Sequence, residues 1–110
     1  MPIIRSRKLL DHANGAPCQN CGRQDGTIVA AHANRQILGK GMGHKAMDLF
    51  HAHLCVVCHA WLDQGGTGKD PTGRYEPTRA DKWEMFCTAM HKTWAYLWAA
   101  GVIGLKDERR

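Results

Sequence analysis

The most regular pattern of apolar and polar positions lies in the last third of the chain. Over residues 78–101, apolar side chains recur at spacings of three and four, which predicts one long amphipathic helix. Thr78 can cap the start of this helix, with Asp81 at the third position completing a capping box, and Gly101 can end it. The stripe is expected to pack in the core or against a second copy of the chain, and its members are Trp83, Phe86, Cys87, Met90, Trp94, Leu97 and Trp98.

Four shorter elements are predicted before this helix. The segment 5–14 is expected to form a short basic helix capped by Ser6, because apolar residues occupy one side of it. Runs rich in β-forming residues at 27–32 and 48–54 predict two strands, and a helix over 57–64 is expected after them. The resulting order is helix, strand, strand, helix and long helix, in a single α+β domain.

The loops and the second strand carry polar residues whose roles the pattern leaves open. The segments 33–47 and 65–77 are rich in glycine and are predicted to be loops. A Gly-Lys-Gly run in the first loop suggests a phosphate cradle, but the Gly-Lys-Ser/Thr of a P-loop is missing, so a flexible basic loop beside a site is favoured. His51 and His53 alternate with apolar neighbours, and one ring is expected to point inward and the other outward.

The cysteines carry the strongest chemical signal. Cys18-x-x-Cys21 and Cys55-x-x-Cys58 are two pairs at the spacing of zinc knuckles, and their four thiolates suit a tetrahedral Zn²⁺ site. Cys87 is left over and is expected to be a core thiol. The second pair precedes a histidine and so also matches the attachment signature of c-type haem, but haem attachment requires an oxidising compartment and leaves the first pair without a role. A structural zinc is therefore favoured.

Length and charge narrow the class of protein. A chain of 110 residues with 44% hydrophobic content is expected to form one compact domain, which a bound metal would help to stabilise. The formal charge of +5 and the pI of about 9.1 favour a polyanionic partner such as DNA. Because no secretory leader and no membrane-spanning run is found, a cytoplasmic location without a membrane partner is expected.

The segment between the two cysteine pairs carries a second set of chemically active residues. The predicted strands and the helix after them form a ββα unit, with His32 at the end of the first strand. His59 and Asp63 lie four residues apart and share one face of the helix, where they can hold a divalent cation such as Mg²⁺. A neutral imidazole at His32 can take a proton from an attacking water molecule. This combination predicts metal-assisted hydrolysis of a phosphodiester.

These motifs resemble a known family. Cys-x-x-Cys, Ala-His and Cys-x-x-Cys-His resemble the zinc-containing branch of the HNH, or ββα-metal, endonucleases, and more closely the YbcO-like family of prophage-encoded nucleases. The resemblance covers most of the chain and is carried by Pro17, Cys18, Gln19, Ala31, His32, Gly41, Lys45, Asp48, Cys55, Cys58, His59, Asp63, Trp94, Leu97, Trp98, Gly101, Val102 and Ile103. It implies a small ββα-metal core, a DNA substrate and a phage or prophage origin.

The resemblance also implies a role for individual residues. His32 would be the general base, Asp48 would orient it in the place of the HNH asparagine, and His59 would ligate the catalytic cation. Many HNH enzymes place a metal-ligating Asp or His immediately before the base, where this chain has Ala31. Either the cation is held weakly, or catalysis has been lost, or the coordination is completed by one of Asp48, Asp63 and His51.

Basic side chains are expected to hold the DNA backbone without reading its sequence. They are Arg5, Arg7, Lys8, Arg35, Lys40 and Lys45, with Lys69 and Arg74 as further candidates. The alternative function is a non-catalytic zinc-ribbon protein that binds DNA or a replication or recombination protein, and it would not depend on His32. The expected organisation is a basic N-terminal helix at 1–17, a zinc-clamped core at 18–64, a loop at 65–77 and the C-terminal helix at 78–101.

Overall fold

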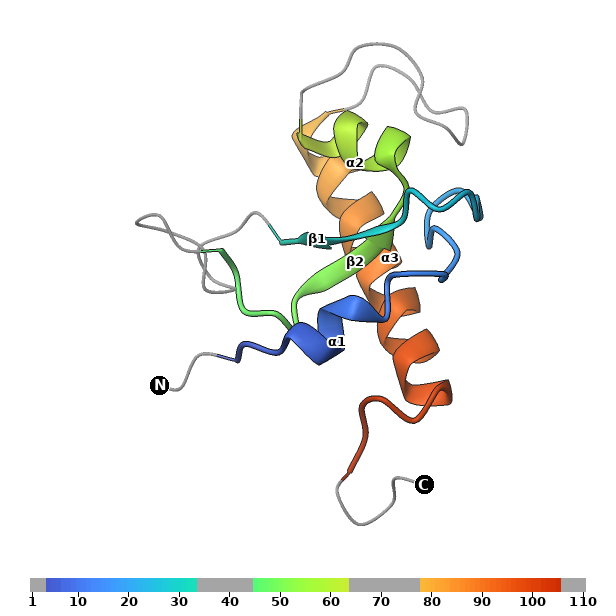
Figure 1. The fold of residues 1–110 in the computed structure, drawn as a ribbon. Coiled ribbons are helices and arrows are strands. Elements are labelled where there is room, and N and C mark those ends of the chain that lie inside the picture. Colours follow the sequence, from blue (N-terminus) through green and yellow to red (C-terminus); the bar gives the residue numbers. More distant parts are fainter. Residues whose placement is uncertain (1–3, 34–44, 64–77, 106–110) are drawn as a thin grey trace.

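The computed structural model describes residues 4–33, 45–63 and 78–105. They form three helices and one two-stranded sheet, which agrees with the predicted α+β class (Figure 1). No helix in this part of the chain is both long and apolar enough to cross a membrane. The elements in chain order are α1 (Arg7–Asp11), β1 (Val29–His32), β2 (His51–Leu54), α2 (Val56–Asp63) and α3 (Arg79–Ala99). The predicted loop at 65–77 and most of that at 33–47 lie outside the described residues.

β1 and β2 pair antiparallel, and their register decides which side chains share a face. His32 lies opposite His51, and Ala31 lies opposite Ala52. Because side chains alternate along a strand, His32, His51 and His53 share one face of the sheet, and the two alanines share the other. We call these the histidine face and the alanine face.

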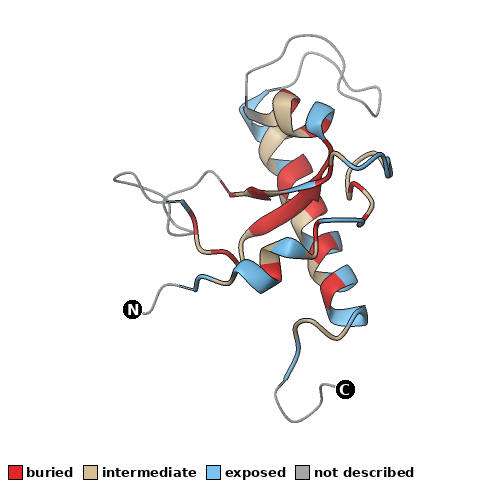
Figure 2. Cartoon of the chain, viewed as in Figure 1, coloured by how far each residue is buried: buried red, intermediate tan, exposed pale blue. Residues whose placement is uncertain are grey.

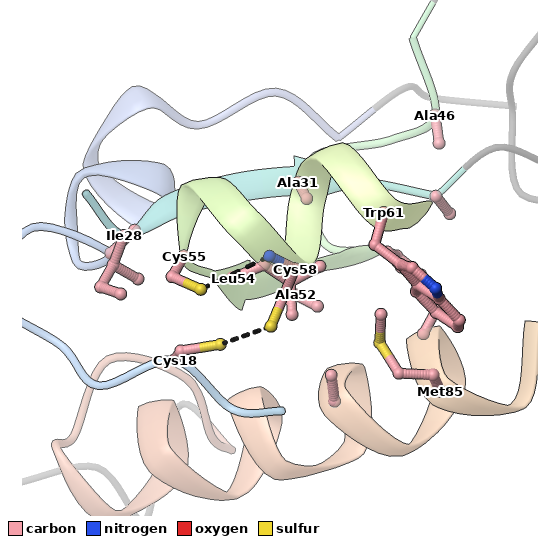
Figure 3. Packing of buried hydrophobic residues seen from close by; sticks show 14 residues of the cluster. Cys18, Ile28, Ala31, Ala46, Ala52, Leu54, Cys55, Cys58, Trp61 and Met85 are labelled. Atoms are coloured by element: carbon pink, nitrogen blue, oxygen red, sulfur yellow. Dashed lines mark hydrogen bonds between the residues drawn. The ribbon is translucent and has the colours of Figure 1, made fainter. Parts of the chain in front are cut away.

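The alanine face carries the main hydrophobic core. Leu54, Cys58 and Trp61 pack with Met85 between the sheet, α2 and α3 (Figure 3). These side chains are buried, and the small alanines leave room for the helices to approach the sheet closely. The second cysteine pair is therefore part of the core and is not confined to a surface knuckle.

β2 is buried along its whole length (Figure 2). β1 covers one of its edges. On the other edge, the backbone N–H of His53 donates to Thr93 Oγ1 at 2.9 Å, and the carbonyl of His53 accepts from the backbone N–H of Gln19 at 2.8 Å. A two-stranded sheet is only marginally stable by itself, so these contacts along the second edge of β2 help to stabilise the sheet.

α3 begins and ends where the sequence predicts. Thr78 Oγ1 accepts from the backbone N–H of Asp81 at 3.0 Å, and the Asp81 carboxylate accepts from the backbone N–H of Thr78 at 2.9 Å. Gly101 follows the last turn with a φ of +76°, a conformation that favours glycine at a helix end. The capping box and the glycine stop are both confirmed.

The buried face of α3 differs in part from the predicted stripe. Phe86 and Leu97 are buried as expected, but Trp98 is 54% exposed and Cys87 is only half-buried. A hydrophobicity pattern gives little weight to small or polar side chains, although close packing against β2 requires them. The buried residues of the helix are Met85, Phe86, Ala89, Thr93 and Leu97.

α1 is shorter than its predicted range. Ser6 Oγ accepts from the backbone N–H of Leu9 at 3.1 Å, which confirms the predicted cap. The helix nevertheless ends at Asp11, because the next residues form turns that lead to Gly15, whose φ is +82°. The basic segment is therefore a single helical turn followed by a compact turn region.

The second strand also starts later than predicted. It begins at His51 and not at residue 48, because Asp48 and Leu49 form a turn. The indole N–H of Trp94 donates to the carbonyl of Leu49 at 2.8 Å and so ties this turn to α3. The other elements differ from prediction by one or two residues, and β1 ends at His32 as expected.

Replacing Thr93 with valine tests the closed edge of β2. Valine keeps the shape of threonine but removes Oγ1, so the buried N–H of His53 loses its acceptor. We expect Thr93→Val to lower the free energy of unfolding by about 1–3 kcal/mol in urea denaturation. Thr88 is exposed on the same helix, and Thr88→Val should cost less than about 0.5 kcal/mol. Equal losses in the two variants would contradict this role of Thr93.

Candidate functional site

The four cysteines of the two predicted pairs meet at one end of the hairpin. Cys18 and Cys21 lie before β1, Cys55 directly follows β2, and Cys58 lies in the first turn of α2. Their sulfur atoms all lie within 4.8 Å of one another. The two pairs therefore form a single group that can hold a metal ion, as the spacing predicts.

The distances between these sulfur atoms fit zinc. The Sγ atoms of Cys18 and Cys58 are 3.7 Å apart, and so are those of Cys21 and Cys55. A tetrahedron with Zn–S bonds of ~2.3 Å has edges of about 3.8 Å, whereas a disulfide would bring two sulfurs to about 2.0 Å. Four thiolates complete the tetrahedron and leave no position for a substrate, which is typical of a structural site.

Hydrogen-bond donors surround the sulfur atoms. The backbone N–H of Cys21 points at Cys18 Sγ and that of Cys58 points at Cys55 Sγ, each at 3.5 Å. The side-chain amide of Asn20 donates to Cys58 Sγ at 3.3 Å. Donors of this kind orient the ligands and stabilise negative charge on sulfur. Asn20 lies inside the first Cys-x-x-Cys pair, yet the motif alone gives no signal of its role.

One cysteine of the group favours the thiolate form before any cation is considered. A hydrogen bond with Cys58 lowers the pKa of Cys18 to about 4, although burial opposes this shift. The same hydrogen bond raises the pKa of Cys58, and burial raises the pKa of Cys21. One thiolate is thus stabilised within the group, and a bound Zn²⁺ would displace the remaining thiol protons.

His32 and Asp48 meet at the opposite end of the hairpin. His32 Nε2 lies 2.9 Å from Asp48 Oδ1, and 15% of the His32 side chain is exposed. Because a carboxylate can only accept, Nε2 carries the proton in the neutral ring and Nδ1 keeps the lone pair. Asp48 therefore holds the His32 ring in one orientation and one tautomer.

Asp48 is itself held by the segment before α1. The backbone N–H of Ser6 donates to Asp48 Oδ2 at 2.5 Å, and Arg5 Nη1 donates to Asp48 Oδ1 at 3.2 Å. Burial by itself would raise the pKa of Asp48, but the hydrogen bonds from His32 and these two donors lower it below its usual value. Asp48 is therefore ionised at neutral pH.

The prediction that His51 and His53 point to opposite sides is wrong. Both residues are 0% exposed, and their ring centroids are 5.4 Å apart, because residues two apart on a strand share a face. His51 Nδ1 lies 2.6 Å from the carbonyl oxygen of Asp48, and His53 packs edge-on against Tyr96. Burial lowers the pKa of both rings, that of His53 to about 4, so both are neutral at pH 7.

Few of the described residues are placed to bind the expected catalytic cation. His59 lies half-buried in α2, and the side chain of Asp63 at the end of α2 is outside the described residues. Ala31 is buried in the core cluster that includes Trp61 of α2, where it offers no ligand. In the part of the chain that the structure describes, the cysteines alone bring three or more donor groups together. The described residues therefore do not assemble a second metal site.

The predicted DNA-binding residues have different surroundings. Arg7 and Lys8 are exposed on α1, and Lys45 is exposed before the Asp48 turn. Arg5 instead donates from Nη1 to the carbonyl of Ala46 at 2.6 Å and from Nη2 to the carbonyl of Lys45 at 2.9 Å. These internal contacts are in addition to its contact with Asp48. Outside the described residues lie Arg35, Lys40, Lys69 and Arg74.

Comparisons with known proteins assign neither a family nor a function to this chain. No protein-family model, no curated protein and no solved structure matches the chain. The protein is thus defined by its fold and its site as a small α+β domain with a two-stranded antiparallel sheet and a four-cysteine group that can hold zinc.

Metal analysis of the purified protein tests the four-cysteine site. We expect one zinc ion per chain, and we expect Cys55→Ser to lose it, because three thiolates no longer complete the tetrahedron. Loss of a structural zinc should also abolish cooperative thermal unfolding, since zinc binding contributes directly to folding. Cys87 lies on α3 outside the group, so Cys87→Ser is the matched control and should keep its zinc. Full zinc content in Cys55→Ser would contradict the assignment.

Proposed function

We propose that this protein is a small DNA endonuclease that hydrolyses phosphodiester bonds with His32 as the general base, in the manner of the HNH nucleases it resembles. The observation that carries the proposal is the 2.9 Å contact between His32 Nε2 and Asp48 Oδ1 at the end of β1. A general base needs a group that orients it and access to its substrate. Asp48 orients His32, and 15% of the His32 side chain is exposed.

The tautomer of His32 suits this chemistry. With the proton on Nε2 directed at Asp48, Nδ1 can accept a proton from a water molecule. The water oxygen then forms a bond to phosphorus, the bond from phosphorus to the 3′-oxygen breaks, and the 3′-oxygen takes up a proton. The products carry 5′-phosphate and 3′-hydroxyl ends. The negative charge of Asp48 stabilises the imidazolium formed at His32.

A divalent cation would polarise the phosphate and stabilise charge on the leaving oxygen. The first candidate ligand is His59, which lies half-buried in α2. The second candidate is Asp63 on the same helix, whose side chain lies outside the described residues. Since Ala31 offers no ligand, the cation would be bound chiefly from α2. Under this proposal, cleavage of DNA depends on an added divalent cation.

The charge distribution supports a nucleic-acid substrate. The chain carries a formal charge of +5, and Arg7 and Lys8 are exposed on α1. α1 starts directly after Ser6, whose backbone contacts Asp48, so these two side chains lie on the element next to the proposed base. Contacts of lysine and arginine with phosphates would position DNA at His32 without selecting a sequence.

A non-catalytic zinc-held protein that binds DNA, or a protein of replication or recombination, is the second candidate. Ala31 and the lack of a second group of metal ligands among the described residues favour it. In such a protein the contact between His32 and Asp48 would only fasten the hairpin to the segment before α1. The two candidates share the zinc site and differ in whether His32 is needed.

Plasmid nicking separates the two candidates. With Mg²⁺, Mn²⁺, Co²⁺ or Ni²⁺ present, we expect the wild-type protein to nick supercoiled DNA, and His32→Ala to do so 10²–10⁴-fold more slowly, roughly the usual contribution of a general base. His91 is exposed on α3, and His91→Ala should cut at the wild-type rate. Cutting that survives His32→Ala would eliminate the assigned base, and no cutting with any metal would favour the binding protein.

Salt dependence of DNA binding tests the basic surface of α1. Fluorescence anisotropy should show tighter binding at low salt, and the double variant Arg7→Ala, Lys8→Ala should reduce the slope of log K against log salt by about 1–2, one for each lost phosphate contact. Arg79→Ala with Lys92→Ala removes the same charge from exposed positions of α3 and should leave the slope almost unchanged. Equal changes in both double variants would show that only net charge matters.

A further inference from the structure

The four cysteines of the zinc site differ in how far they are covered. Cys18, Cys55 and Cys58 belong to the buried core cluster (Figure 3), whereas Cys21 only packs against that cluster and is partly exposed. Cys21 also lies in a turn before β1, outside any helix or strand. A reagent that approaches the site from solvent therefore meets Cys21 before the other three cysteines.

We propose that Cys21 is a modification site at which a hydroperoxide oxidises the zinc-bound protein, and that Cys55 completes the reaction by forming a disulfide with it. The inference rests on the four-cysteine zinc site and does not depend on the role of His32. Zn²⁺ keeps its cysteine ligands deprotonated, and the thiolate is the form that attacks a peroxide. Oxidation follows thiolate character and exposure, and Cys21 is the zinc ligand that combines the two.

Cys55 is placed to react with an oxidised Cys21. Their Sγ atoms are 3.7 Å apart, and a disulfide has a length of about 2.0 Å, so the two sulfurs must approach by less than about 2 Å. Cys55 directly follows β2 and is buried, so it does not compete with Cys21 for an oxidant from solvent. One cysteine of this pair is therefore accessible, and the other is held next to it.

The other close pair of sulfurs is better protected. Cys18 and Cys58 are also 3.7 Å apart, but both are buried. The side-chain amide of Asn20 donates to Cys58 Sγ at 3.3 Å, and a hydrogen bond to a thiolate lowers its nucleophilicity. We therefore expect this pair to be oxidised after Cys21 and Cys55.

The oxidation proceeds in two steps. The Cys21 thiolate attacks one oxygen of hydrogen peroxide, the O–O bond breaks, and hydroxide leaves while Cys21 becomes a sulfenic acid. The Cys55 thiolate then attacks the Cys21 sulfur, the S–O bond breaks, and a second hydroxide leaves as the disulfide forms. The two sulfurs together lose two electrons, and the peroxide gains the same two.

Disulfide formation would release the zinc ion. Cys18 and Cys58 would be the remaining thiolates, and two ligands do not complete the tetrahedron. Because zinc binding contributes to folding, its release would weaken the domain, although the disulfide would still link the first cysteine pair to the second. A hydroperoxide would thus act on the stability of the protein through Cys21.

Peroxide treatment of the zinc-loaded wild-type protein tests this sequence of steps. A zinc-sensitive dye should report release of the ion, in proportion to the chains that carry a disulfide between Cys21 and Cys55. Tandem mass spectrometry locates the bond, because Cys18 and Cys21 share one tryptic peptide. With dimedone present to trap sulfenic acids, the first adduct within the zinc site should form on Cys21. Cys87 lies on a separate tryptic peptide and outside the group, so it is the internal control and should enter no disulfide.

A histidine at position 21 removes the reactive thiol and keeps a zinc ligand. Three cysteines and one histidine also form a common zinc site, so Cys21→His should retain one zinc per chain. We expect this variant to release zinc under peroxide about tenfold more slowly than the wild type, since the remaining thiolates are buried. Cys87→Ser removes a half-buried thiol outside the group and should release zinc at the wild-type rate.

Three results would overturn the proposal: a first adduct within the zinc site on Cys18, Cys55 or Cys58, a first disulfide other than that between Cys21 and Cys55, or release of zinc from Cys21→His as fast as from the wild type. If Cys21→His does not fold, the position of the first adduct in the wild-type protein decides. These readouts need no DNA cleavage, so a protein that cuts no DNA would reject the nuclease function and leave the role of Cys21 to be decided by the adduct and the disulfide.

Discussion

Convergence of four cysteine sulfurs on one position is the constraint on which the rest of this structure depends. The first pair lies before β1, and the second pair joins the end of β2 to the start of α2. Gln19, inside the first pair, also donates its backbone N–H to the carbonyl of His53 in β2. A metal held by these sulfurs would therefore tie three segments together, which a two-stranded sheet in a chain of this size could not achieve by its own pairing.

The enclosure of β2 follows from this arrangement. The core fills the alanine face, α3 closes the free edge through Thr93, and both histidines of the strand are buried on the other face. The two rings pack against each other, and His51 Nδ1 contacts the carbonyl of Asp48. His51 Nε2 and both ring nitrogens of His53 are buried without a hydrogen-bond partner among the described residues. Bulk water does not reach either ring in this structure.

Local sequence signals predicted the cysteine pairs, both caps and the end of β1 at His32, because each depends on residues within a few positions of one another. The surroundings of Asp48 could not be predicted, because Arg5 and Ser6 lie 43 and 42 residues away. The buried pair at His51 and His53 was missed for another reason: polar side chains on a strand were expected to divide between core and solvent, whereas tertiary packing covers both faces of β2.

His32 differs from the two buried histidines in the features that matter for chemistry. Its partner is an ionised carboxylate and not a backbone carbonyl, and part of its side chain is exposed. The sulfur group lies at the other end of β2, separated from the Asp48 turn by a strand of four residues, about 13 Å of extended chain. Asp48 is held by residues that precede α1, so the four-cysteine group does not determine the position of Asp48. A second, independent set of contacts thus holds His32, which stays partly exposed, and this arrangement is the structural basis for the proposal that His32 is a general base.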